Sequence, residues 1–216
     1  HRVMLEHAPQ LIRGMQLAMR ATGSVRGIVG VEDNKPDAVL AIQAAIDELQ
    51  ADNLFVEAVP TKYPQGSEKM LLMSLFGVEI PSGALPVSLG MVMNNVGTLA
   101  ALGQLLPAGQ GLTERVVTIA GPGVSRPGDY RVPLGTPISF VLEWAGATLQ
   151  PGKNAPSACQ LVLGGPMMGQ AVASLDTPVT KGVSGILVFG REDMADRDCR
   201  ATYPCIKCGE CVESCP

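Results

Sequence analysis

The chain has 216 residues, a formal net charge of −4, 46% hydrophobic residues and only 17% charged residues. This length and composition predict one or two globular domains with apolar cores. There is no basic cluster of the kind that binds nucleic acid, and no apolar run is long enough to cross a bilayer. We therefore expect neither a nucleic-acid partner nor a transmembrane segment in these residues.

The first part of the chain has the pattern of a parallel α/β sheet. Apolar residues at helical spacing predict a helix over residues 8–22, which stops at Gly23. A strand at 25–31, a helix over 36–50 and a strand at 54–59 follow. A strand, a helix and a strand at this spacing form a βαβ unit, so the two strands should be parallel.

Two segments follow the carboxyl ends of these strands, residues 32–35 and 60–68. Ligands of parallel sheets bind at such ends, so both segments are candidate binding loops. In the first of them, Asp33 or Asn34 could instead cap the next helix. In the second, Ser67 precedes a short predicted helix, whose free backbone N–H groups could bind an anion.

A third strand is predicted over residues 89–93, followed by Asn94, Asn95 and a helix that ends near Leu106. Two amide side chains between a strand and a helix N-terminus can hydrogen-bond a polar ligand and its phosphate. Simple capping of the helix by asparagine is an equally good interpretation.

The pattern changes after residues 107–111, which contain glycine and proline and predict a domain boundary. We expect a small α+β domain with a mixed sheet over residues 112–190. Its predicted elements are strands at 115–120, 128–132, 160–163 and 180–189 and a helix at 138–145. The glycine-rich stretch 164–169 is interpreted as a structural turn, because no lysine and serine of a phosphate loop follow it.

The chain closes with a C-x2-C-x2-C-x3-C-P run of cysteines: Cys205, Cys208, Cys211 and Cys215. Bacterial ferredoxins hold [4Fe–4S] clusters with this spacing, and the fourth cysteine ligates the second cluster. A structural zinc site would show separate cysteine pairs or histidines, and a disulfide framework belongs to short secreted chains. We predict iron ligation by these four thiolates. Cys199 fits no position of the motif, and the chain is expected to be an internal part of a longer polypeptide.

Several stretches in order along the chain resemble the C subunit of the Rnf electron-transport complexes, which are ferredoxin:NAD oxidoreductases. The same stretches resemble, more distantly, the NADH-binding flavin subunit of respiratory complex I. They are residues 32–36, 61–66, Glu68, 81–83, 94–98, 164–169, 178–182 and the cysteine run.

The resemblance implies three domains. Residues 1–107 would be the C-terminal part of a Rossmann-like domain that binds FMN and NADH. Residues 112–190 would be a β-grasp, soluble-ligand-binding domain with its flanking strands. Residues 196–216 would be the first half of a two-cluster ferredoxin-like module.

The resemblance also implies roles for individual residues. Asn94, Asn95 and Thr98 would contact FMN. Tyr63, Gly66 and Glu68 would lie beside the flavin and the nicotinamide. The flavin subunit of complex I has two consecutive acids where this chain has a serine before Glu68, so the first acidic contact would be lost. The glycine-rich FMN loop of the family is not among these residues, so we expect them not to hold FMN tightly by themselves.

The implied function is electron transfer between NAD(H), FMN and two [4Fe–4S] clusters. The protein would be peripheral, on the cytoplasmic face of the inner membrane. Its partners would be other subunits of a membrane complex, including an iron–sulfur subunit. No side chain is expected to act as an acid or base. Two alternatives are a cobalamin reductase of bacterial microcompartments and a non-catalytic electron-transfer adaptor.

Overall fold

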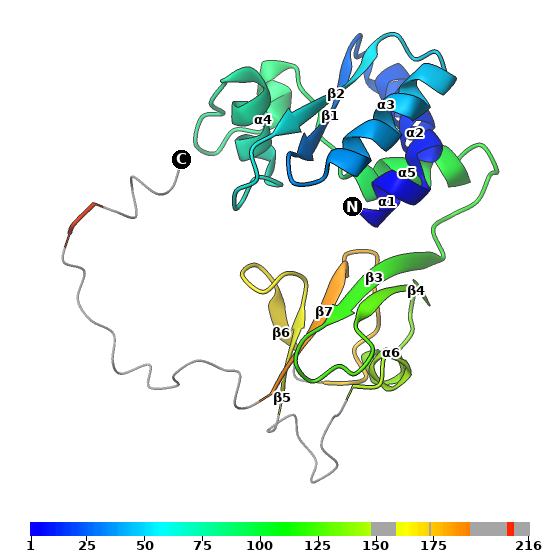
Figure 1. Ribbon diagram of the computed structural model, residues 1–216, viewed down its shortest axis with the longest axis vertical. Helices are drawn as coiled ribbons and strands as arrows, with labels where there is room; N and C mark the ends of the chain where they lie inside the picture. The colour runs from blue at the N-terminus through cyan, green and yellow to red at the C-terminus, as the bar shows by residue number, and fades with distance from the viewer. Residues whose placement is uncertain (148–158, 173, 191–206, 210–216) are drawn as a thin grey trace. The chain divides into compact units, whose positions relative to one another are not determined.

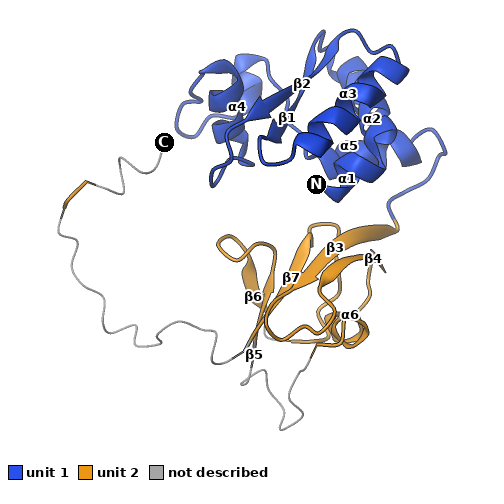
Figure 2. Cartoon of the chain, viewed as in Figure 1, with its two compact units in different colours: residues 1–112 blue, residues 113–216 orange. Residues whose placement is uncertain are grey.

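The computed structural model describes residues 1–147, 159–172, 174–190 and 207–209. The chain divides into two compact units, residues 1–112 and 113–216 (Figure 2).

Unit 1 contains a two-stranded parallel sheet, formed by β1 (Gly27–Glu32) and β2 (Leu54–Val59) (Figure 1). Helix α3 (Pro36–Glu48) connects the two strands. This confirms the predicted βαβ unit and its parallel pairing. The other helices of unit 1 are α1 (Arg2–Glu6), α2 (Ala8–Thr22), α4 (Glu68–Phe76) and α5 (Val96–Leu105), with a 3₁₀ turn η1 (Pro86–Leu89).

The core of unit 1 lies between α2, α3, α5 and one face of the sheet. The apolar stripe of α2 is buried as its spacing predicts, and α2 ends at Gly23, which has a left-handed φ of 74°. The fully buried side chains of this core include Leu11, Ile12, Val31 and Ile42. The helix prediction for residues 8–22 is therefore confirmed in both its ends and its buried face.

Helices α2 and α5 touch through their backbones at two glycines. A Cβ added at Gly14 would lie 1.8 Å from the carbonyl oxygen of Leu99. A Cβ added at Gly103 would lie 1.9 Å from the carbonyl oxygen of Gln10. Real Cβ atoms do not approach backbone atoms so closely, so only glycine allows these two helices to pack at this distance.

The strand predicted over residues 89–93 is wrong. The chain instead makes η1, then Gly90 adopts a left-handed φ of 69°, and residues 91–95 have no regular secondary structure. Within the described part of unit 1 the sheet contains only β1 and β2, so this apolar stretch has no strand to pair with.

The predicted capping of α3 by Asp33 or Asn34 is also wrong. Lys35 occupies the N-cap position of α3, and no side chain makes a capping hydrogen bond there. The carboxylate of Asp33 instead accepts a hydrogen bond from the hydroxyl of Thr61, which follows the end of β2.

Unit 2 has a five-stranded mixed sheet with the strand order β4-β3-β7-β5-β6. Among its described strand pairs, only β3 and β7 are parallel. The elements are β3 (Glu114–Ala120), β4 (Gly128–Pro133), α6 (Ile138–Trp144), β5 (Cys159–Leu163), β6 (Gln170–Val172) and β7 (Gly185–Gly190). The predicted mixed α+β domain is therefore confirmed.

The turn predicted over residues 164–169 is confirmed, since it connects β5 to the antiparallel β6. Strand β6 was not predicted because it has only three residues. Strand β7 begins at Gly185, later than the predicted Thr180. The buried face of α6, with Ile138 and Val141, packs in one core with strand residues of the sheet.

Among the residues that the structure describes, none of the helices combines the length and the apolar character that a membrane crossing requires.

Candidate functional site

The loops that follow β1 and β2 are hydrogen-bonded to each other at the carboxyl ends of the two strands. Oδ1 of Asp33 accepts hydrogen bonds from the backbone N–H of Thr61 at 3.1 Å and from its hydroxyl at 2.6 Å. The Thr61 hydroxyl in turn accepts from the backbone N–H of Asn34 at 3.3 Å. Both candidate loops therefore lie at the carboxyl ends of parallel strands, where α/β sheets bind ligands.

The charged groups of the first loop are largely engaged with each other. The hydrogen bond from the Thr61 hydroxyl lowers the pKa of Asp33, so this carboxylate is ionised at neutral pH. Lys35 forms an ion pair with Glu32 and donates to Oδ1 of Asn34 at 3.1 Å. These interactions fix the conformation of the loop.

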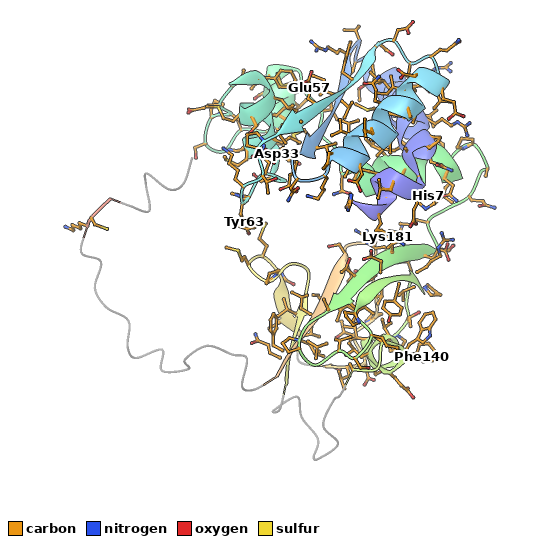
Figure 3. The ribbon with its side chains drawn as sticks, viewed as in Figure 1. His7, Asp33, Glu57, Tyr63, Phe140 and Lys181 are labelled. Atoms are coloured by element: carbon orange, nitrogen blue, oxygen red, sulfur yellow. The ribbon has the colours of Figure 1, made fainter. Side chains whose placement is uncertain are left out.

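The second loop leaves its predicted site residues open to solvent. Tyr63, which Figure 3 labels, is 54% exposed, and Gly66 and Glu68 are also exposed. A Cβ at Gly66 would meet no atom within 4 Å, so the space beside it is free. Ser67 is the N-cap residue of α4 but its side chain makes no capping hydrogen bond, so the first N–H groups of α4 receive no side-chain acceptor from it.

One polar side chain of this loop is buried. Gln65 is only 2% exposed, and neither its amide oxygen nor its amide nitrogen has a hydrogen-bond partner. A buried unpaired polar group costs about 1–3 kcal/mol. The sequence does not predict the burial of Gln65, because a glutamine in a polar turn carries no signal that its side chain will be buried.

We expect Gln65→Met to raise the free energy of unfolding by about 1–2 kcal/mol, because it keeps the volume and removes the unpaired amide. Thermal unfolding of the intact protein measures this change. Gln43→Met is the matched control, since Gln43 is exposed on α3 and bonds Asp47 at 2.8 Å. A loss of stability at position 65 would mean that the amide makes hydrogen bonds in solution.

The paired asparagines differ in their surroundings. Asn95 is the N-cap residue of α5, and its Oδ1 accepts from the backbone N–H of Gly97 at 2.8 Å. Asn94 makes no part of this cap, and both asparagines and Thr98 are exposed. The capping interpretation therefore holds for Asn95, while its exposed position leaves the amide nitrogen accessible to a ligand.

Unit 1 also contains a cavity of about 490 Å³ beside β1. Its walls come from α2, β1, α4, residues 90–94 and α5, and they are mostly apolar. Of the predicted flavin and nicotinamide contacts, only Asn94 belongs to these walls. The structure thus brings Asn94 beside β1. Tyr63 and Gly66 lie on the separate loop after β2, and Glu68 is the first residue of α4.

Of the predicted cluster ligands, only Cys208 lies within the described residues, and its thiol is free and exposed. Cys205, Cys211 and Cys215 lie outside the described residues, as does Cys199.

Comparisons with known proteins identify relatives along the whole chain. Residues 1–104 match the Nuo51 FMN-binding domain family, and residues 116–171 match the SLBB domain family. The chain is 38% identical over 216 residues to the C subunit of the proton-translocating ferredoxin:NAD(+) oxidoreductase complex of Clostridium ljungdahlii, covering 100% of this chain and 45% of that protein. It is 38% identical over 219 residues to the C subunit of the Na(+)-translocating ferredoxin:NAD(+) oxidoreductase complex of Acetobacterium woodii, covering 100% of this chain and 46% of that protein. The chain therefore spans less than half the length of these curated relatives.

Solved structures share the fold. A NAD+-reducing [NiFe]-hydrogenase in the air-oxidized state superposes with a TM-score of 0.71 at 21% identity, covering 88% of this chain and 37% of that one. The same kind of hydrogenase in the H2-reduced state gives a TM-score of 0.70 at 23% identity, and the match covers 87% of this chain and 37% of the hydrogenase chain. Together with the two domain matches, this likeness confirms the predicted succession of an α/β domain of the flavin-binding type and a β-grasp domain.

Proposed function

The chain belongs to the family formed by the C subunits of ion-translocating ferredoxin:NAD oxidoreductase complexes and is related to the flavin-binding subunit of complex I, and from this premise we propose that it is an electron-transfer subunit. It passes electrons between NAD(H), FMN and [4Fe–4S] clusters. The observation that carries this proposal is the identity of 38% along the whole chain to relatives of that name.

The residues at the start of α5 fit the phosphate-bearing part of a flavin. Asn94, Asn95 and Thr98 present exposed polar side chains beside the N-terminus of a ten-residue helix. Helix N-termini favour anions because their first N–H groups are unpaired and the helix dipole is positive there. We assign these three residues to FMN binding, and the match of residues 1–104 to an FMN-binding domain supports the assignment.

The loop after β2 fits a second, more exposed ligand. Tyr63 offers an aromatic ring, Glu68 can accept hydrogen bonds from hydroxyl groups, and the space beside Gly66 is free. We assign this loop to the nicotinamide nucleotide and to the exposed edge of the flavin. When bound, FMN supplies the conversion between two-electron transfer with NAD(H) and one-electron transfer with iron–sulfur clusters.

The cysteine run fits iron rather than another metal. Four thiols with ferredoxin spacing are the donor set of [4Fe–4S] clusters. One of them, Cys208, is exposed and forms no disulfide bond. We assign Cys205, Cys208, Cys211 and Cys215 to two clusters of the intact protein.

The partners follow from the names of the relatives, which are subunits of translocating complexes. We propose that this chain is a peripheral subunit on the cytoplasmic face of the membrane. It would exchange electrons there with an iron–sulfur partner subunit of the same complex.

Asn95 allows the flavin role to be separated from the helix cap. Asn95→Ala removes both the cap and the amide, so we expect about 1 kcal/mol of lost stability and flavin binding weaker by roughly ten- to a hundredfold. Asn95→Ser keeps a good cap but removes the amide, so it should restore the melting temperature and not the flavin. The measurements are the flavin-to-iron ratio and the melting temperature of the intact protein.

A normal flavin ratio in Asn95→Ser would remove this residue from the flavin site and leave it as a helix cap. An intact wild-type protein that folds and carries iron but no flavin would instead favour the non-catalytic adaptor.

A further inference from the structure

The turn between β5 and β6 presents two adjacent methionines to solvent. The side chains of Met167 and Met168 are 72% and 75% exposed. Figure 1 shows this turn as the loop that connects β5 to β6. Large apolar side chains at a protein surface are common and need no explanation. These two, however, are thioethers, and an accessible thioether is open to oxidation.

The base of this turn is tightly built, while its tip is open. The backbone N–H of Gly169 donates to the carbonyl oxygen of Gly165 at 2.7 Å, which closes a turn over residues 166–168. A Cβ added at Gly169 would lie 2.4 Å from Cγ1 of Val162, so this end of the turn lies against β5. A Cβ added at Gly165 would meet no atom within 4 Å. Backbone interactions therefore hold the turn, and neither methionine belongs to the core of unit 2.

The other methionines of the described residues are less accessible than this pair. Three belong to the core of unit 1 and are 7–9% exposed: Met4, Met15 and Met19. Three more are half-buried: Met70, Met91 and Met93. Met73, on α4, is 41% exposed. Exposure thus separates Met167 and Met168 from the rest of this set.

Oxidation of a thioether by hydrogen peroxide requires only access and solvent. A lone pair of the sulfur attacks one peroxide oxygen, so that an S–O bond forms and the O–O bond breaks. The second oxygen leaves as water after a proton moves to it, so the sulfur is oxidised and the peroxide is reduced. Negative charge develops on the leaving oxygen, and water stabilises this charge at the surface but not inside an apolar core. No side chain of the protein is needed as an acid or a base.

The position of the pair also decides what the modification does to the fold. Methionine sulfoxide is polar, so forming it at Met15 or Met19 would place a polar group in the apolar core of unit 1. At Met167 and Met168 the new oxygen stays in water, and the hydrogen bond that closes the turn is made by the backbone. The fold of unit 2 should therefore tolerate sulfoxides at both positions.

We propose that Met167 and Met168 form a surface site of reversible oxidation, at which peroxides oxidise the protein before they oxidise any other methionine of the described residues. Methionine sulfoxide reductases return the sulfoxide to the thioether. The exposed pair on its short turn is accessible to such an enzyme without unfolding of unit 2. This inference does not depend on the flavin and cluster assignments.

Peptide mapping by mass spectrometry after graded doses of hydrogen peroxide tests the order of reactivity in the intact protein. Sulfoxide should form at Met167 and Met168 at least about twofold faster than at Met73 and at least about tenfold faster than at Met15 and Met19. Met73 is the control because it is the next most exposed methionine of the described residues. An oxaziridine, which modifies thioethers without peroxide, reports access alone. Rates at the pair that are no higher than the rate at Met73 with either reagent would overturn the proposal.

The melting temperature and a reductase test the tolerance of the fold and the reversibility. Protein that is oxidised only at the pair should melt within about 2 °C of untreated protein. A methionine sulfoxide reductase should remove both added oxygens from the folded protein. The variant with Met167→Leu and Met168→Leu is the matched control, since it has no thioether in this turn. A larger fall in melting temperature that this variant does not show under the same treatment, or sulfoxides that the enzyme reduces only after unfolding, would also overturn the proposal.

Discussion

Gly103→Ala is expected to unfold unit 1 at temperatures at which the wild-type protein is folded. The new methyl group would lie 1.9 Å from the carbonyl oxygen of Gln10, and no rotamer change can move either the methyl group or the backbone atom. The helices α2 and α5 would have to separate, which would disrupt the contact at Gly14 as well. We expect a loss of at least about 3 kcal/mol, at the upper end of the range for overpacked cores.

Thermal unfolding of the intact protein, followed by circular dichroism, measures this loss as a fall in melting temperature of roughly 10–20 °C. Gly97→Ala is the matched control in the same helix, because a Cβ there would meet only Oδ1 of Asn95, at 3.1 Å. Its effect should stay within about 1 kcal/mol, since alanine also favours the helix. Equal melting temperatures for both variants would contradict the close backbone contact of α2 and α5.

Cys208→Ser is expected to abolish one of two [4Fe–4S] signals in electron paramagnetic resonance of the reduced intact protein. The thiolate is the iron ligand in the proposed cluster loop, and a serine hydroxyl does not replace it. The rest of the protein should keep its fold and its flavin, because Cys208 is exposed and belongs to neither core.

Cys199→Ser is the control for this experiment. Cys199 precedes the motif and fits no ligand position in it, so both signals should remain. If both signals survived in Cys208→Ser as well, the proposed ligand set would be wrong. If Cys199→Ser alone removed a signal, Cys199 would take the place of one of the four motif cysteines.

Sequence patterns were most reliable where the determinants are local. The apolar spacing of residues 8–22 and the glycine that follows them predicted α2 with both of its ends. The strand, helix and strand between residues 25 and 59 predicted the parallel pair β1 and β2. Periodicity works here because the buried face of a helix or strand is repeated along a few consecutive turns or residues.

Residues 89–93 show where a local pattern was insufficient. Their apolar side chains favour a strand, but a strand exists only when a neighbour supplies its hydrogen bonds. In the described part of unit 1 no strand pairs with this segment, and the segment is irregular. The same dependence on distant partners explains Asp33, whose carboxylate bonds Thr61 rather than the helix that follows it.

The amino-acid sequence alone was sufficient to locate the candidate loops and the cysteine run, because each depends on residue types at short, regular spacings. Two features required the tertiary structure: the burial of Gln65 and the backbone contact at Gly14 and Gly103. Each of these depends on which distant residues come within contact distance. A residue's burial and its hydrogen-bond partners are properties of the packed chain, so no pattern of neighbours along the sequence could reveal them.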